Sequence, residues 1–216
     1  MSPAPQKPPI TFPEYERLFR TIHAIVANEK GDPSKACLFF AIAGAYLLAK
    51  HHGLREARPM AGFAGYNLRL PTNLVLLLGA VSENETASHE DAFHCWIEVE
   101  GYVLDLTAPL FDQMAPQDRK GSRVRPQLFQ KPQGTGVGSV EQLNSPGAYM
   151  HVRNPDLLAA LMARFTQLRA NEDLVNICLQ WYVRPPKRMA PYVGVGNQHG
   201  QVQQVPLSPV QLEGAW

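Results

Sequence analysis

Apolar and polar residues alternate along 93–107, which reads FHCWIEVEGYVLDLT. Alternation is typical of a half-buried β-strand, because successive side chains point to opposite faces of a sheet. The dipeptide Glu100-Gly101 divides the segment, and Gly accepts the positive φ that a two-residue hairpin turn requires. We therefore predict a β-hairpin in which Val99 pairs with Tyr102.

Helical periodicity predicts two helices before this hairpin. The first follows a capping box, Thr11-x-x-Glu14, and carries an apolar stripe. The second begins with Asp32 and Pro33 and continues without a breaker to Gly53. It is rich in alanine and apolar nearly all round, which is typical of a buried helix.

The other elements are shorter or come later in the chain. The segment 108–148 mixes Pro, Gly, Gln and Asp with short apolar pieces, so we expect surface loops and one short helix near 110–114. Apolar runs predict strands at 58–68, 74–79 and 149–152, and periodic patterns predict helices that begin at Asn154 and Asn171.

We expect one domain with an appendage at each end. A chain of 216 residues can bury one substantial core. Residues 1–10 hold four prolines and are predicted to be a disordered arm. Residues 11–184 form the predicted domain, and 185–216, rich in Pro, Gly and Gln, form a tail that drapes over it.

Composition and charge argue against several classes of function. A net charge of +1 provides no basic field for nucleic acid. No apolar run reaches membrane-spanning length, and the first ten residues lack the apolar segment of a secretory signal. Three cysteines are too few for a disulfide scaffold. We therefore expect a cytoplasmic protein without a nucleic-acid or membrane partner; its oligomeric state stays open.

His94 and Asp105 are the first candidates for chemistry. In the predicted register they are diagonal neighbours on one face of the hairpin, about 7–8 Å apart at the backbone. A carboxylate within an apolar strand costs energy unless it is paired. A His that is held by a carboxylate is half of a catalytic triad.

Cys37 is the candidate nucleophile. It lies near the start of the second predicted helix, where free N–H groups and the helix dipole favour a thiolate. A neighbouring His can take the proton of the thiol, and a carboxylate can fix the tautomer of that His. We therefore assign the nucleophile to Cys37, the base to His94 and the orienting acid to Asp105.

The order Cys, then His-x-Trp, then a glycine turn and Asp resembles the transglutaminase-like branch of the papain-like cysteine enzymes. The resemblance covers about residues 30–108, and the whole chain also resembles an uncharacterised bacterial family in that superfamily. It implies an α+β papain-like fold, with a Cys-bearing buried helix packed on an antiparallel sheet and extra C-terminal helices. It also implies thiol-dependent acyl chemistry.

The chain departs from the papain-like pattern at the oxyanion donor. No glutamine lies shortly before Cys37, and Asn28, nine residues upstream, is the remaining side-chain candidate. Otherwise the backbone N–H groups of the helix start form the oxyanion hole alone. We expect Trp96 to shield the triad face from water, with plain packing as an equal alternative.

Several interpretations of the function and of the site remain open from the sequence alone. The expected function is hydrolysis of an amide, peptide or ester bond through a thioester. The alternatives are an acyltransferase of the transglutaminase or arylamine acetyltransferase type, and a binding module that keeps the triad without turnover. Zinc on Cys37, His94 and Asp105 is chemically possible, but no ligand spacing supports it, so we expect no metal and no cofactor.

Overall fold

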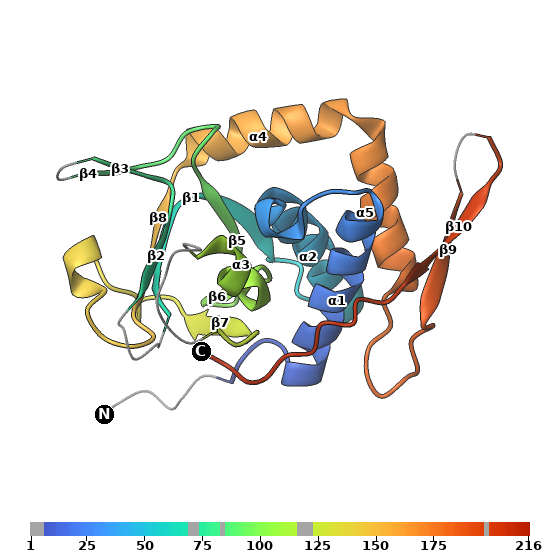
Figure 1. Ribbon diagram of the computed structural model, residues 1–216, viewed down its shortest axis with the longest axis horizontal. Helices are drawn as coiled ribbons and strands as arrows, with labels where there is room; N and C mark the ends of the chain where they lie inside the picture. Colours follow the sequence, from blue (N-terminus) through green and yellow to red (C-terminus); the bar gives the residue numbers. More distant parts are fainter. Residues whose placement is uncertain (1–6, 69–73, 83–84, 116–122, 197–198) are drawn as a thin grey trace.

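The computed structural model describes residues 7–68, 74–82, 85–115, 123–196 and 199–216. It shows a mixed α+β architecture in which a curled antiparallel sheet is packed against helices (Figure 1). The helices of the described residues are α1 (Phe12–Asn28), α2 (Cys37–His52), α3 (Phe111–Met114), α4 (Pro155–Gln167) and α5 (Arg169–Trp181), with short 3-10 turns η1 (Pro33–Lys35), η2 (Ala108–Leu110) and η3 (Val140–Gln142).

Strand β1 is the hub of the main sheet. It pairs with β5 along its first half and with β2 and β8 along its second half, and β5, β6 and β7 follow one another as neighbours. All these pairs are antiparallel. The strands are β1 (Arg58–Asn67), β2 (Val75–Leu78), β5 (His94–Val99), β6 (Tyr102–Asp105), β7 (Phe129–Pro132) and β8 (Tyr149–Arg153).

The predicted hairpin and its register are confirmed. Val99 pairs with Tyr102, and Ile97 pairs with Leu104. The turn residues Glu100 and Gly101 have φ of 48° and 73°, the positive values that a two-residue hairpin turn needs. The hairpin is nevertheless buried on both faces, because every residue of β5 and β6 is buried. The expectation of a half-buried strand was wrong in this respect.

Two apolar clusters explain this double burial. On one face, α1, α2 and α5 pack against the side chains of Cys95, Ile97 and Val99. On the other face, Trp96 and Val103 pack against a second cluster that lies around Phe111, Phe129 and the C-terminal Trp216. The segment 108–148 is therefore more than a set of surface loops, since it supplies strand β7 and much of this second cluster.

The second helix begins later than the sequence pattern predicts. Asp32 caps only the 3-10 turn η1, where its carboxylate accepts a hydrogen bond from Ser34 N–H at 3.0 Å. Ala36 has φ −98° and ψ 27°, which interrupts the helix, and α2 starts at Cys37. The interruption makes Cys37 the first residue of the helix, so its position favours a thiolate more than the sequence suggested.

Both ends of the chain pack against the domain. Ile10 is buried, and its N–H donates to the Gln130 side chain at 3.3 Å, so the predicted arm ends before this residue. The predicted tail contains an unforeseen hairpin of β9 (Tyr192–Gly196) and β10 (Val202–Pro206), which projects from the body in Figure 1. The last residues run along α1 and end beside the residue before β7, where Trp216 N–H donates to the Leu128 carbonyl. A further small hairpin, β3 (Ala80–Ser82) with β4 (Glu85–Ala87), projects near β2.

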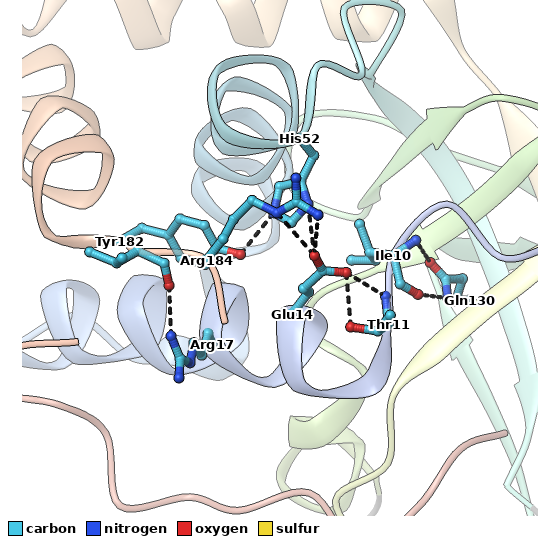
Figure 2. A network of polar contacts seen from close by, with 9 residues as sticks. Ile10, Thr11, Glu14, Arg17, His52, Gln130, Tyr182 and Arg184 are labelled. Carbon is cyan, nitrogen blue, oxygen red and sulfur yellow. Dashed lines mark hydrogen bonds and ion pairs between the residues drawn. The ribbon is translucent and has the colours of Figure 1, made fainter. Parts of the chain in front are cut away.

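A polar network around Glu14 joins three segments that are distant in sequence (Figure 2). The Glu14 carboxylate accepts the Thr11 N–H at 2.8 Å, as the capping box predicts, and the Arg184 guanidinium at 2.6 Å. Its neighbour His52 bonds Tyr182 Oη at 2.8 Å. Burial raises the pKa of Glu14, but the Thr11 and Arg184 hydrogen bonds outweigh it, and the pKa falls to about 2. The network fixes α1, the end of α2 and the segment after α5.

Among the described glycines, Gly62 leaves the least room for a Cβ, and we expect Gly62→Ala to destabilise the protein. Gly62 pairs with His94, and a Cβ added to it would lie 1.9 Å from the Val152 carbonyl oxygen. The clash is with backbone, so β8 must shift away from β1, at a cost of about 1–3 kcal/mol. Chemical denaturation measures this loss. Gly196→Ala is the control because a Cβ there meets nothing within 4 Å, and an equal effect of both variants would contradict the argument.

No helix within the described segments is both long enough and apolar enough to cross a bilayer.

Candidate active site

Three element ends bring Cys37, His94 and Asp105 together. Cys37 is the first residue of α2, His94 is the first of β5, and Asp105 is the last of β6. Helix α2 packs directly against β5, so the helix start meets the strand start. The exposed fractions of the side chains are small, at 7% for Cys37, 2% for His94 and zero for Asp105.

The Asp105 carboxylate is held by four hydrogen-bond donors. His94 Nε2 lies 2.7 Å from Oδ2, and the Tyr66 hydroxyl donates to the same oxygen at 2.6 Å. Thr107 donates its N–H to Oδ1 at 2.9 Å and its hydroxyl at 2.6 Å. Tyr15 donates its hydroxyl to the Asp105 backbone carbonyl. Every acceptor direction of the carboxylate is thereby used, which fixes its orientation.

The pKa values of His94 and Asp105 indicate an ion pair. Burial by itself lowers the pKa of His94, but the Asp105 charge and hydrogen bond outweigh it and raise the pKa to about 10. Burial likewise raises the pKa of Asp105, but the charge and hydrogen bond of His94 outweigh it and lower the pKa to about 2. Near neutral pH the pair is therefore an imidazolium and a carboxylate.

The Cys37 thiol is the more acidic partner of two adjacent thiols. Its pKa is lowered to about 5, first by a hydrogen bond from the Cys95 thiol and then by a hydrogen bond from His94, against the opposing effect of burial. The same contact raises the pKa of Cys95 well above its usual value. Cys37 is therefore a thiolate at neutral pH, and Cys95 is its thiol donor.

Cys95 has a larger part in the site than the sequence indicates. The alternation of β5 places Cys95 on the face opposite His94, and it belongs to the core cluster beneath α2. The start of α2 lies at the start of β5, however, so both His94 and Cys95 are close enough to lower the pKa of Cys37, although these successive residues point to opposite faces. In the sequence, Cys95 is adjacent to His94, but no pattern indicates that it lies close to Cys37.

The two supporting candidates, Asn28 and Trp96, make their side-chain hydrogen bonds with residues other than Cys37. The Asn28 amide donates to Glu29 Oε1 at 3.0 Å, and Asn28 lines a hollow formed with α5 and the β9–β10 hairpin. Trp96 is buried on the Asp105 face of β5, where its Nε1–H donates to Glu98 Oε1 at 3.1 Å and its ring lies 4.5 Å from that of His151. The structure thus groups Trp96 with His151 and the second apolar cluster, whereas Cys37 is the first residue of α2, where backbone N–H groups lack intrahelical acceptors.

Tyr15, Tyr66 and Thr107 were missed by reasoning from the sequence. Thr107 carried a local signal, since an Asp two residues before a Thr often accepts its N–H and hydroxyl in a turn. Tyr15 and Tyr66 carried none, because they lie 90 and 39 positions from Asp105.

A metal centre has no support within the described part of the chain, where no group of three or more His, Cys, Asp or Glu side chains is placed to hold an ion. His51 and His52, at the end of α2, bond the Leu179 carbonyl and the Tyr182 hydroxyl instead.

Comparisons with known proteins place the chain in a family. Residues 11–216 match the model of the family described as "Protein of unknown function (DUF2026)", and the chain belongs to that family. The match includes the C-terminal tail as well as the domain.

One solved structure shares the whole fold. A crystal structure reported as that of "genomics APC5867" superposes with a TM-score of 0.83 at 27% sequence identity, and the likeness covers 98% of each chain. None of the curated proteins matches the chain.

Proposed function

We propose that this protein is a thiol-dependent hydrolase of amide, peptide or ester bonds that works through a thioester acyl-enzyme. The observation that carries the proposal is the chain of contacts from Cys37 to His94 to Asp105, with the sulfur at the start of a helix and the second ring nitrogen of His94 bonded to Asp105 at 2.7 Å. The same observation supports a papain-like, transglutaminase-like fold for the domain.

The proposed acylation begins from the thiolate and imidazolium pair. The Cys37 sulfur attacks the carbonyl carbon of the substrate, and the carbonyl oxygen becomes an oxyanion. The first N–H groups of a helix lack intrahelical acceptors, so those at the start of α2 are positioned to donate to that oxyanion. His94 then gives its Nδ1 proton to the leaving amine or alkoxide, and a thioester on Cys37 remains.

Deacylation reverses these roles. Neutral His94 takes a proton from water, the resulting hydroxide attacks the thioester carbon, and the acid product leaves with return of the thiolate and imidazolium pair. Asp105 keeps its charge throughout and holds His94 with Nε2–H toward itself and Nδ1 toward the sulfur. An amine in place of water would give acyl transfer, so competition between the two nucleophiles distinguishes a hydrolase from a transferase.

The pH dependence of alkylation tests the proposal. We expect the rate of Cys37 alkylation by iodoacetamide to rise through pH about 5 and to stay level above it, because the pKa of this thiol is lowered to about 5. Cys178 should react only at far higher pH, since burial raises its pKa to about 12. Mass spectrometry of peptides measures both rates in one sample.

His94→Gln is the informative variant for this measurement. It removes the imidazolium and keeps a polar side chain, so the curve of Cys37 alkylation rate against pH should move to higher pH. A wild-type curve that rises only near pH 9, as for an ordinary thiol, would contradict the proposed activation. Formation of an acetyl thioester on Cys37 with p-nitrophenyl acetate would show the acyl-enzyme directly.

A further inference from the structure

We propose that Tyr66 and His151 are positioning residues of this site, which extend the triad into a hydrogen-bond chain from His151 through Tyr66 to Asp105. The inference rests on the proposed thiol chemistry and adds two residues that act through Asp105. Neither residue carried a functional signal in the sequence.

The chain is continuous and buried. Tyr66 Oη lies 2.6 Å from Asp105 Oδ2 on one side and 2.8 Å from His151 Nε2 on the other. Tyr66 is 2% exposed. Its ring meets the ring of His94 edge-on with centroids 6.1 Å apart, and it meets the ring of His151 in the same way at 5.4 Å.

The sheet sets this arrangement. In the pairing of β1 with β8, Tyr66 lies opposite Tyr149 and His151 lies opposite Ala64. Tyr66 and His151 are thus diagonal neighbours on one face, the same relation that joins His94 to Asp105 on β5 and β6. The ring of Trp96 packs against the ring of His151, with centroids 4.5 Å apart.

Counting protons gives each bond a direction. The Asp105 carboxylate only accepts, so the single hydroxyl proton of Tyr66 points to Oδ2. The contact between Tyr66 Oη and His151 Nε2 then needs a proton from His151. His151 is therefore the neutral tautomer that carries its proton on Nε2, and its Nδ1 holds a lone pair.

Two further observations agree with that tautomer. His151 Nδ1 is buried and has no hydrogen-bond partner among the described residues, so a second ring proton would have no acceptor. Burial is the main cause that lowers the pKa of His151, to about 3, with the nearby charges of Asp105 and His94 opposing each other. A neutral donor at this place fixes the Tyr66 hydroxyl in one orientation at any moderate pH.

This orientation bears on the reaction through Asp105. The Tyr66 proton occupies the lone pair of Oδ2 that His94 does not use, while Thr107 occupies Oδ1. The carboxylate can neither rotate nor accept a third partner on Oδ2, so the His94 ring keeps Nδ1 toward Cys37. Without the Tyr66 proton, the Asp105–His94 bond loses this constraint and the imidazolium leaves the sulfur more easily.

Three variants separate positioning from packing. Tyr66→Phe keeps the ring and removes the hydroxyl. His151→Gln places its amide nitrogen near the position of Nε2 and can still donate to Tyr66, whereas His151→Asn has the same chemistry but reaches only as far as Nδ1. Thermal melts of all three identify any general loss of folding.

The main measurement is the pH curve of Cys37 alkylation by iodoacetamide. We expect Tyr66→Phe to move the curve to higher pH and to slow the reaction at pH 6 by about 10- to 100-fold, the size of loss that misplacement by about 1 Å causes. His151→Asn should move the curve in the same direction, and His151→Gln should keep the wild-type curve. A packing role would change the melts of these variants and leave the curve in place.

Nitrogen NMR of the histidine rings provides a readout that does not depend on activity. In wild type, His151 should carry its proton on Nε2 only. In Tyr66→Phe the acceptor is gone, and His151 should become a mixture of the two tautomers. If Tyr66→Phe fails to fold, the tautomer of His151 in wild type and the alkylation curves of His151→Gln and His151→Asn still test the positioning role.

The outcomes distinguish the two proposals. A wild-type Cys37 that reacts as an ordinary thiol overturns the proposed function. A reactive wild-type Cys37 with unchanged curves in Tyr66→Phe and His151→Asn overturns the positioning role alone, as does a His151 with its proton on Nδ1.

Discussion

Cys37→Ala is expected to abolish turnover of any ester or amide substrate, with a loss on the order of 10⁶-fold, because no thioester can form. The substitution removes one sulfur from a side chain that is 7% exposed and leaves His94 and Asp105 paired. The fold should therefore persist, and the pair should remain titratable. Activity on p-nitrophenyl acetate, and the mass of the protein after incubation with it, measure the loss.

Cys178→Ser is the matched control for Cys37→Ala. Cys178 is fully buried in α5, outside the ends of α2, β5 and β6 that carry Cys37, His94 and Asp105, so its loss should lower stability and leave activity per folded molecule unchanged. If activity survives in Cys37→Ala but falls in Cys178→Ser, the assignment of the nucleophile to Cys37 is wrong. Activity that survives in both would favour a binding module.

Asp105→Asn is expected to lower the turnover rate by about 10⁴-fold, the loss that a triad incurs when an amide stabilises the wrong tautomer of its His. The amide nitrogen cannot accept, yet four donors from His94, Tyr66 and Thr107 converge on this side chain. Either His94 turns its unprotonated nitrogen to the amide or one donor loses its partner. Stability should fall by about 1–3 kcal/mol as well, the cost of a buried group without a partner.

The stability loss of Asp105→Asn should depend on pH in a defined way. The pKa of Asp105 is lowered to about 2 in the folded protein and is about 3.9 in an unfolded chain. A lowered pKa means that the carboxylate contributes stability above pH about 3.9 and loses it as the pH falls through about 2. The difference in unfolding free energy between wild type and variant should therefore shrink below pH 4.

Asp112→Asn is the matched control for Asp105→Asn. Asp112 also accepts a backbone hydrogen bond, from Val124 N–H at 2.8 Å, and it lies in α3 outside the triad. Its replacement should cost stability and leave the rate unchanged. Equal losses of rate in both variants would show that general destabilisation, and not the tautomer of His94, explains the effect.

Local patterns were enough to find the three residues that the structure brings together at the proposed site. Alternation and the Glu100-Gly101 turn set the parity of the hairpin, and parity alone decides that His94 and Asp105 share a face. The position of Cys37 near a helix start followed from a run of helix-forming residues after Asp32 and Pro33. These features depend on neighbours in sequence, so the sequence determined them by itself.

Tertiary structure decided what surrounds those three residues. The contact of Cys37 with Cys95 requires α2 to pack on β5. The bond from Tyr66 to Asp105 requires β1 and β6 to flank β5, and the bond between His151 and Tyr66 requires β8 to pair with β1. The second cluster that buries Trp96 is completed by Trp216, from the far end of the chain. Each contact joins segments tens of residues apart, and no periodicity encodes which segments meet. The sequence by itself thus identified Cys37, His94 and Asp105. Their burial, their pKa values and their supporting hydrogen bonds depend on how the strands and helices pack together.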